Sequence, residues 1–303
     1  MDRILVIGAG LLGSRIIEAA GAPANCEVHG ADVDTTLGEL GCEFHTLDIT
    51  NKKAVSDLIT SIRPSAVFHT AALTNVDRCE LDKDAALRIN GTASGNIALA
   101  CAKVDAYLCY ISTDYIFDGA KTEPYVETDP PNPLGVYGRS KLAGDEAVRA
   151  VGGAHLIFRL CWVYGARGQN FMLTMMRLAR EREKLRVVSD QVGCPTWSRM
   201  IAETTTLALK QAIAADDLGS FTGTYHLASS GTTSWHGFAD AIVKLMPAEG
   251  RKCVRVEAIS TAEYPTPTKR PAYSVLSCDK LERTFGLRLP HWEDSLKQVL
   301  EGI

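Results

Sequence analysis

The segment ILVIGAGLLGSR, residues 4–15, predicts the fold of this chain more directly than any other stretch. It opens with a short continuous apolar run, as in a strand that is buried on both faces. Gly8, Gly10 and Gly13 then form GxGxxG, followed by apolar residues at helical spacing. Such glycines allow a tight turn, close approach of a pyrophosphate, and close packing of a helix whose N-terminus faces the anion. We therefore interpret the segment as the start of a dinucleotide-binding unit.

The same alternation of strand and helix continues through the first half of the chain. Apolar runs at 4–8, 26–32, 65–72, 106–113 and 154–165 alternate with helical patterns at 11–21, 51–64, 84–104 and 137–152. This rhythm predicts an α/β fold with a Rossmann-like, doubly wound parallel sheet. Later helices are expected at 170–182, 198–214, 234–246 and 292–301.

The chain is expected to have two parts. Residues 1–165 would form the dinucleotide-binding domain, rejoined by a helix and a strand near 197–228. Residues 166–303 would form a smaller C-terminal α/β substrate-binding part, because the pattern there becomes irregular and its loops are rich in Pro, Thr and Gly.

Composition limits the partners of this chain. A formal net charge of -4 gives no global basic field for nucleic acid or an anionic membrane, and no apolar run approaches membrane-spanning length. The nine cysteines stand singly, without CxxC pairs or metal-ligand spacing. We therefore expect a cytoplasmic protein with reduced thiols and no metal site, either a monomer or a homodimer.

Asp32 ends the predicted strand 26–32, about 20 residues after the glycines, where a carboxylate would bond the ribose hydroxyls of a dinucleotide. A carboxylate would repel a 2′-phosphate, and no Arg follows in residues 31–40. This favours NADH over NADPH. The alternative is that Asp34 or the adjacent threonines at 35–36 set the choice.

Three further positions along the predicted nucleotide path have two interpretations each. Asp48 would meet the adenine edge, or else cap the helix that begins near Asn51. Ala71 and Ala72 would leave room for the nucleotide, or else pack tightly. His69, on the same strand, is interpreted as a core residue with its hydrogen bonds satisfied rather than as a ligand.

Tyr137 and Lys141 in the segment YGRSK lie one helical turn apart, so they share a helix face. Their helix follows the strand that ends in Ser112 and Thr113, and ligands of open parallel sheets bind beyond the strand ends. A nearby ammonium would lower the pKa of a phenol, which is ordinarily near 10. With a hydroxyl from Thr113 to orient the substrate oxygen, Tyr137 would act as the general acid in carbonyl reduction.

Several longer motifs extend this pattern, and with them the chain resembles the extended short-chain dehydrogenase/reductases, within them the dTDP-4-dehydrorhamnose reductase family. The segments that carry the resemblance are HTAALTNVDRCE (69–80), LRINGTASGNIALAC (87–101), ISTDYIFDG (111–119), YGRSKLAGDE (137–146), FRLCWVYG (158–165), DQVGCPT (190–196) and RPAYSVLSCDKL (270–281). They follow one another in order over nearly the whole chain.

The resemblance implies a catalytic triad of Thr113, Tyr137 and Lys141. Hydride would pass from NADH or NADPH to the C4 ketone of a nucleotide-linked 4-keto-6-deoxy sugar, converting dTDP-4-dehydrorhamnose to dTDP-rhamnose. Tyr137 would protonate the new alkoxide, and Lys141 would also bond the nicotinamide ribose. Asn90 would hold water or backbone around the triad.

Two sets of binding residues complete the expected site. The cofactor would be contacted by Gly8, Gly10, Leu11, Leu12, Gly13, Asp32, Asp48, Ile49, Ala71, Ala72, Asn90, Tyr137 and Lys141. The nucleotide-sugar would be contacted by Thr74, Asp114, Tyr115, Trp162, Gln191 and Arg270. The planar fork of Arg270 suits a diphosphate, although a surface ion pair is the alternative. For Trp162 the alternative is a core aromatic residue.

The chain departs from the family pattern at three places. Its phosphate loop is GxGxxG rather than GxxGxxG, so the pyrophosphate contacts would shift. Arg15 stands where some members carry a metal-binding Glu, so a magnesium-bridged dimer of that kind is not expected. Cys161 replaces the usual Ser, and because a thiol bonds weakly the pocket would be less polar.

Other functions of the superfamily remain as alternatives. A dehydratase usually has Asp-Glu after the catalytic Thr, whereas Asp114 is followed here by Tyr115. An epimerase must retain its cofactor through the reaction, and no residue in the sequence indicates such retention. A non-catalytic dinucleotide-binding regulatory subunit, like that of methionine adenosyltransferase, is the alternative from another class, although the intact Thr113, Tyr137 and Lys141 weigh against it.

Overall fold

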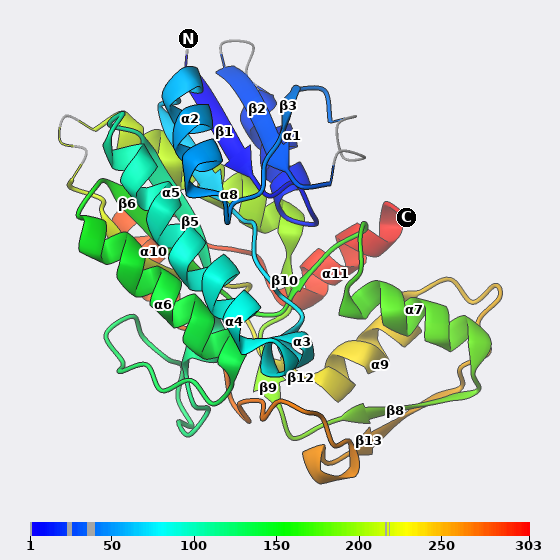
Figure 1. Cartoon of the computed structure of the whole chain (residues 1–303). Coiled ribbons are helices and arrows are strands. Elements are labelled where there is room, and N and C mark those ends of the chain that lie inside the picture. Colours follow the sequence, from blue (N-terminus) through cyan, green and yellow to red (C-terminus); the bar gives the residue numbers. More distant parts are fainter. Residues whose placement is uncertain (1, 23–25, 35–39, 216, 218) are drawn as a thin grey trace.

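The computed structural model describes residues 2–22, 26–34, 40–215, 217 and 219–303. At its centre lies a seven-stranded sheet in the order β11-β6-β5-β4-β1-β2-β3, in which every neighbouring pair is parallel (Figure 1). The strands are β1 (Asp2–Ile7), β2 (Cys26–Asp32), β3 (Glu43–Thr46), β4 (Ala66–His69), β5 (Tyr107–Thr113), β6 (His155–Leu160) and β11 (Gly223–Leu227). The predicted Rossmann-like parallel sheet is confirmed. Strand order reverses between β1 and β4, which is where such sheets bind their ligands.

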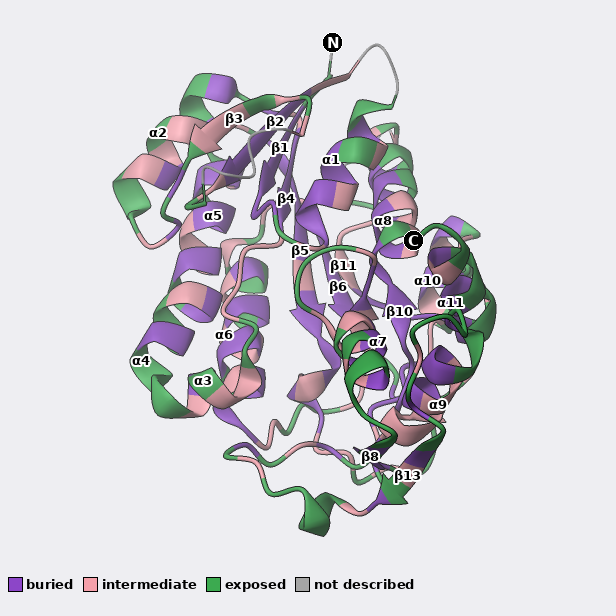
Figure 2. Ribbon diagram, turned by 90° about the vertical axis from the view of Figure 1, so that its right-hand side faces the viewer, coloured by how far each residue is buried: buried purple, intermediate pink, exposed green. Residues whose placement is uncertain are grey.

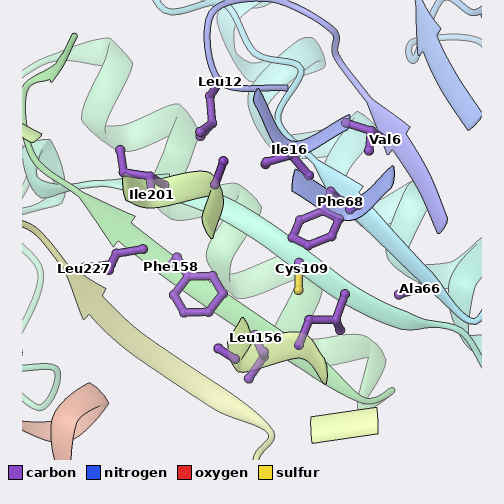
Figure 3. Packing of buried hydrophobic residues seen from close by; sticks show 14 of the residues in the cluster. Val6, Leu12, Ile16, Ala66, Phe68, Cys109, Leu156, Phe158, Ile201 and Leu227 are labelled. Carbon is purple, nitrogen blue, oxygen red and sulfur yellow. The ribbon is translucent and has the colours of Figure 1, made fainter. Parts of the chain in front are cut away.

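Helices cover both faces of the sheet. One face carries α1 (Gly13–Gly21) and α8 (Ser198–Ile213), and the other carries α2 (Lys52–Ile62), α5 (Ala93–Ala102) and α6 (Val136–Val151). Alternate side chains of β1 point to opposite faces of the sheet. Val6 packs with Ile16 and Ile201 on one face, whereas Leu5 and Ile7 pack on the face covered by α2 and α5. Figure 3 shows the first of these cores. The sheet is accordingly buried between helices whose outer sides are exposed (Figure 2).

The later part of the chain builds a third core. It is formed by α7 (Phe171–Glu181), α9 (Trp235–Leu245) and α11 (Trp292–Glu301), with the two-stranded sheet of β8 (Lys184–Val188) and β13 (Arg255–Ile259). In contrast, β11 is a strand of the large sheet and α8 packs on one face of that sheet. Helix α10 (Asp279–Phe285) packs near β11. The division at residue 165 stays a prediction. None of the helices in the described part of the chain combines the length and the apolar character needed to cross a membrane.

The structure interrupts two elements that the sequence predicts as continuous. The strand at 154–165 is split into β6 and the short β7 (Val163–Tyr164), because Trp162 adopts a φ of 42° that no strand can contain. The helix at 84–104 consists of α4 (Lys83–Ala86), a π-helical turn over Leu87–Thr92 and α5. Asn90 lies in this π turn, and such turns often occur at functional sites.

The remaining elements are short and lie mainly in connections. They are α3 (Val76–Leu81), a 3₁₀ turn over Asp114–Ile116, β9 (Val192–Gly193), β10 (Thr196–Trp197), β12 (Thr233–Ser234) and a 3₁₀ turn over Thr261–Glu263.

Candidate active site

A cavity of about 670 Å³ opens at the carboxyl ends of the sheet strands. Most of the predicted site residues line it: Gly8, Gly10, Leu11, Leu12, Gly13, Asp32, Asp48, Ile49, Ala71, Ala72, Thr74, Thr113, Asp114, Tyr115, Tyr137 and Trp162. Asn90, Lys141, Gln191 and Arg270 are not among its lining residues. The fold therefore brings the glycine loop and the Tyr137 phenol to one cavity.

The three glycines of the loop meet different surroundings. A Cβ on Gly13 would lie 1.7 Å from the carbonyl oxygen of Gly8, and a Cβ on Gly8 would lie 2.3 Å from the nitrogen of Ala71. A Cβ on Gly10 would have no atom within 4 Å, since this position faces the open cavity. Helix α1 then begins without a side-chain cap or an acid in its first turn. The loop and this helix end fit a bound pyrophosphate.

Asp32 is hydrogen-bonded to the glycine loop. Its Oδ2 atom accepts a 2.7 Å hydrogen bond from the backbone nitrogen of Ala9, and Oδ1 accepts a 3.2 Å bond from the nitrogen of Asp34. The carboxylate thus lies at the cavity wall where a ribose would be expected. The threonines at 35–36, which were considered as alternatives for the cofactor choice, lie outside the described residues.

The capping interpretation of Asp48 is wrong. Asn51 is the N-cap of α2, and its side chain accepts a 3.1 Å hydrogen bond from the nitrogen of Ala54. Asp48 instead accepts bonds of 2.8 and 2.9 Å from the hydroxyl and the nitrogen of Thr50, and these bonds lower its pKa. They hold Asp48 at the cavity wall.

Thr113 and Tyr137 both line the cavity and share a hydrogen bond. Thr113 ends β5, and its hydroxyl donates to Asp114 Oδ1 at 3.1 Å while accepting from the nitrogen of Tyr115 at 3.2 Å. Tyr137 lies in the first turn of α6, with the ring of Tyr115 edge-on at 5.8 Å. Burial raises the pKa of Tyr137, and a hydrogen bond with Thr113 partly opposes this. The phenol therefore carries its proton at neutral pH, as a general acid must.

Lys141 lies beneath this wall. Its Nζ atom donates a 2.6 Å hydrogen bond to the carbonyl oxygen of Ile111 and lies 4.1 Å from the centre of the Tyr110 ring. Burial lowers the pKa of Lys141 to about 7, against the opposing effect of Asp145. The expected lowering of the Tyr137 pKa by Lys141 is not found, because desolvation of the phenol outweighs other effects.

Asn90 connects three segments around the predicted triad. Its Oδ1 atom accepts from the nitrogen of Leu73 at 2.8 Å, and its Nδ2 atom donates to the oxygen of Leu73 at 3.0 Å and to Ser140 Oγ at 2.9 Å. Ser140 lies between Tyr137 and Lys141 on α6. Asn90 thus acts on the position of α6 rather than lining the cavity. His69 is a core residue, 3.0 Å from Ser94 Oγ, and burial lowers its pKa to about 3.

Aromatic side chains line the cavity from the later part of the chain. The rings of Trp162 and Trp235 stack at 3.6 Å with an angle of 9° between their planes, and Phe171 lies 4.6 Å from Trp235. All three line the cavity. Sequence reasoning missed Trp235 and Phe171, because only tertiary packing brings the starts of α9 and α7 to this wall.

Gln191 and Arg270 have protein partners. Gln191 is buried and donates from Nε2 to Thr261 Oγ1 at 3.0 Å. Arg270 Nη2 lies 3.4 Å from Asp77 Oδ2, and its Nε atom has no hydrogen-bond partner among the described residues. The ion pair expected as the alternative for Arg270 is therefore present, and its Nε atom is buried.

Cys161 lies behind the cavity rather than in its wall. It is fully buried, and its sulfur accepts a 3.1 Å hydrogen bond from the nitrogen of Cys194. Its neighbour Asp114 is also buried, which raises the pKa of this carboxyl to about 6. The thiol therefore acts on the environment of Asp114 and not on the cavity surface directly.

Comparison with known proteins gives the family of the chain. The family described as RmlD substrate binding domain matches residues 1–303. The chain belongs to this family. A dTDP-4-dehydrorhamnose reductase of Burkholderia thailandensis is 46% identical over 81% of the chain and 84% of its own length. The enzyme of the same name from Escherichia coli K12 is 40% identical over 84% and 85%.

Solved structures of the RmlD family share the whole fold. A dTDP-4-dehydrorhamnose reductase from Clostridium acetobutylicum superposes with a TM-score of 0.87 at 37% identity, covering 99% of this chain and 98% of that one. The reductase from Bacillus anthracis, solved in complex with NADP, has a TM-score of 0.87 at 35% identity and covers 100% and 99%.

Proposed function

We propose that this protein reduces the C4 ketone of a nucleotide-linked 4-keto-6-deoxy sugar, dTDP-4-dehydrorhamnose, to the alcohol of dTDP-rhamnose. The observation that carries the proposal is the single cavity that holds both the glycine loop and the Tyr137 phenol beside Thr113. Relatives that span most of the chain are named as reductases of this substrate.

A reduced nicotinamide dinucleotide, when bound along the glycine loop, supplies the hydride. The chain supplies the proton. Tyr137 donates its phenolic proton to the C4 oxygen, so the ketone gains one hydride and one proton and becomes an alcohol. The Thr113 hydroxyl orients that oxygen. Lys141, on the same face of α6, bonds the nicotinamide ribose.

The remaining predicted contacts are proposals on the same basis. The glycine loop, Asp32, Asp48 and the alanines after β4 hold the dinucleotide, and Asp32 favours NADH because it would repel a 2′-phosphate. The wall formed by Thr74, Tyr115 and the stacked Trp162 holds the sugar. The planar guanidinium of Arg270 serves the diphosphate.

The proposal is tested by following reduced-nicotinamide absorbance with dTDP-4-dehydrorhamnose, using NADH and NADPH in separate runs. Tyr137→Phe should lower kcat by roughly 10²–10⁴-fold while dinucleotide binding is kept. Tyr264→Phe, at an exposed tyrosine that does not line the cavity, is the matched control.

Two results would contradict the proposal in different ways. Wild-type rates in Tyr137→Phe would show that another group donates the proton. Tight dinucleotide binding without turnover of the keto sugar would favour the non-catalytic regulatory subunit.

A further inference from the structure

Two histidines and two glutamates cluster on the outer strands of the sheet, away from the catalytic cavity. Glu27 and His29 lie on β2, and Glu43 and His45 lie on β3. The parallel register places His29 opposite Glu43 and Ala31 opposite His45. Because side chains alternate along a strand, all four point to the same face of the sheet. None of them lines the cavity.

Three residues of this cluster, His29, Glu43 and His45, each offer one possible ligand atom, and these atoms all lie within 4.8 Å of one another. His29 Nδ1 lies 3.2 Å from His45 Nε2 and 3.6 Å from Glu43 Oε2, and His45 Nε2 lies 3.7 Å from Glu43 Oε1. In a tetrahedral site with ligand distances of about 2.0–2.1 Å, neighbouring ligand atoms are separated by roughly 3.3–3.4 Å. The two imidazole nitrogens and the two oxygens of the Glu43 carboxylate therefore lie at spacings close to those between ligand atoms around one zinc ion.

The second ring nitrogen of His29 supports the same arrangement. His29 is 5% exposed, and its Nε2 atom makes no hydrogen bond within the described structure. Glu27 Oε1 lies 3.3 Å from this nitrogen, and the other carboxylate oxygen of Glu27 is 3.4 Å from Arg3 Nε. A carboxylate beside the distal nitrogen of a histidine is the usual support for a metal-binding imidazole, because it directs the proton to that nitrogen and the lone pair to the metal.

The outer residues of the cluster are accessible to a metal ion from solvent. The Glu43 side chain is 65% exposed, which gives an ion and its water access from solvent. Neutral imidazoles with one carboxylate favour Zn²⁺ over Mg²⁺ or Ca²⁺, which prefer oxygen ligands.

We propose that His29 Nδ1, His45 Nε2 and the Glu43 carboxylate bind one Zn²⁺ ion, with water at the fourth position and Glu27 supporting His29. The ion would link the short edge strand β3 to β2. The sequence predicts no metal site, because the two histidines are separated by 16 positions and only strand pairing joins them.

The test uses the full chain after treatment with a chelator and titrates it with Co²⁺, whose visible spectrum reports coordination. One equivalent of Co²⁺ should bind without a thiolate-to-metal band, and Zn²⁺ should displace it. Glu43→Gln and His45→Gln should each weaken Co²⁺ binding by at least about tenfold, and Glu27→Gln by roughly 10–100-fold. These variants are used instead of a His29 variant, because His29 is buried and its replacement would disturb folding.

His291→Gln, at an exposed histidine on the N-terminal end of α11, is the matched control and should bind Co²⁺ as the wild type does. The proposal is overturned by a thiolate-to-metal band, which would assign the ion to cysteines. It is equally overturned by wild-type affinity in Glu43→Gln and His45→Gln, or by no binding at one equivalent. In the last case the two imidazoles share only a hydrogen bond.

Discussion

The ammonium nitrogen of Lys141 is held 2.6 Å from the carbonyl oxygen of Ile111, two residues before Thr113 on β5. This bond joins helix α6 to β5, the strand that carries Thr113. Lys141 itself is only 3% exposed, so its ammonium group is held away from solvent. The consequence is a lysine whose charge is costly in the folded protein.

We predict that Lys141→Met stabilises the protein more at pH 6 than at pH 9. The pKa of Lys141 falls from 10.5 to about 7 on burial, so between these values the unfolded chain holds a proton that the folded chain has released. Wild-type stability therefore rises with pH in this window, and the cost of the charge is complete below pH 7. The gain from Lys141→Met should differ between pH 6 and pH 9 by on the order of 2 kcal/mol.

Urea denaturation at the two pH values measures this difference. Lys52→Met, at an exposed lysine of α2, serves as the control and should show no comparable pH dependence. An equal effect of Lys141→Met at both pH values would mean that the folded protein keeps Lys141 charged throughout.

Gly10→Ala and Gly13→Ala should separate cofactor binding from folding. A Cβ at position 10 would enter open space in the cavity, so Gly10→Ala should leave the melting temperature nearly unchanged and raise the dinucleotide Kd by roughly tenfold. A Cβ at position 13 would overlap the oxygen of Gly8, so Gly13→Ala should cost about 1–3 kcal/mol of stability. Thermal melts and dinucleotide titrations measure both. A large loss of stability in Gly10→Ala would refute the assignment of this space to the cofactor.

Trp235→Ala should weaken binding of the nucleotide-sugar more than binding of the dinucleotide. Its ring supports Trp162 at 3.6 Å in the cavity wall, and aromatic pairs contribute about 0.5–1.5 kcal/mol beyond their buried area. The expected result is a rise of roughly 3–10-fold in KM for the sugar substrate, with an unchanged KM for the dinucleotide. Trp235→Phe keeps an aromatic ring and should recover part of the effect. An equal rise in both KM values would place Trp235 outside the sugar end.

Features formed by residues close together in the sequence could be predicted, whereas features formed by distant residues could not. The glycine loop and the pair Tyr137 and Lys141 could be predicted, because each rests on local spacing next to a strand end. Trp235 could not, since the start of α9 reaches the cavity only through packing of the third core. β3 also escaped prediction: its four residues EFHT are partly exposed and too short for a clear alternation. The break at Trp162 depends on a positive φ that its side chain does not favour.

Asp32→Asn should shift the cofactor preference toward NADPH. The amide keeps an oxygen that can accept the hydrogen bond from the nitrogen of Ala9, so the glycine loop should hold its shape. It removes the negative charge that would repel a 2′-phosphate. The ratio of kcat/KM for NADPH to that for NADH should therefore rise, by roughly tenfold for 1.4 kcal/mol of relieved repulsion. Asp34→Asn, two residues further on, is the matched control and should change the ratio little. If Asp34→Asn shifts the ratio and Asp32→Asn does not, the choice of cofactor is made beyond the end of β2.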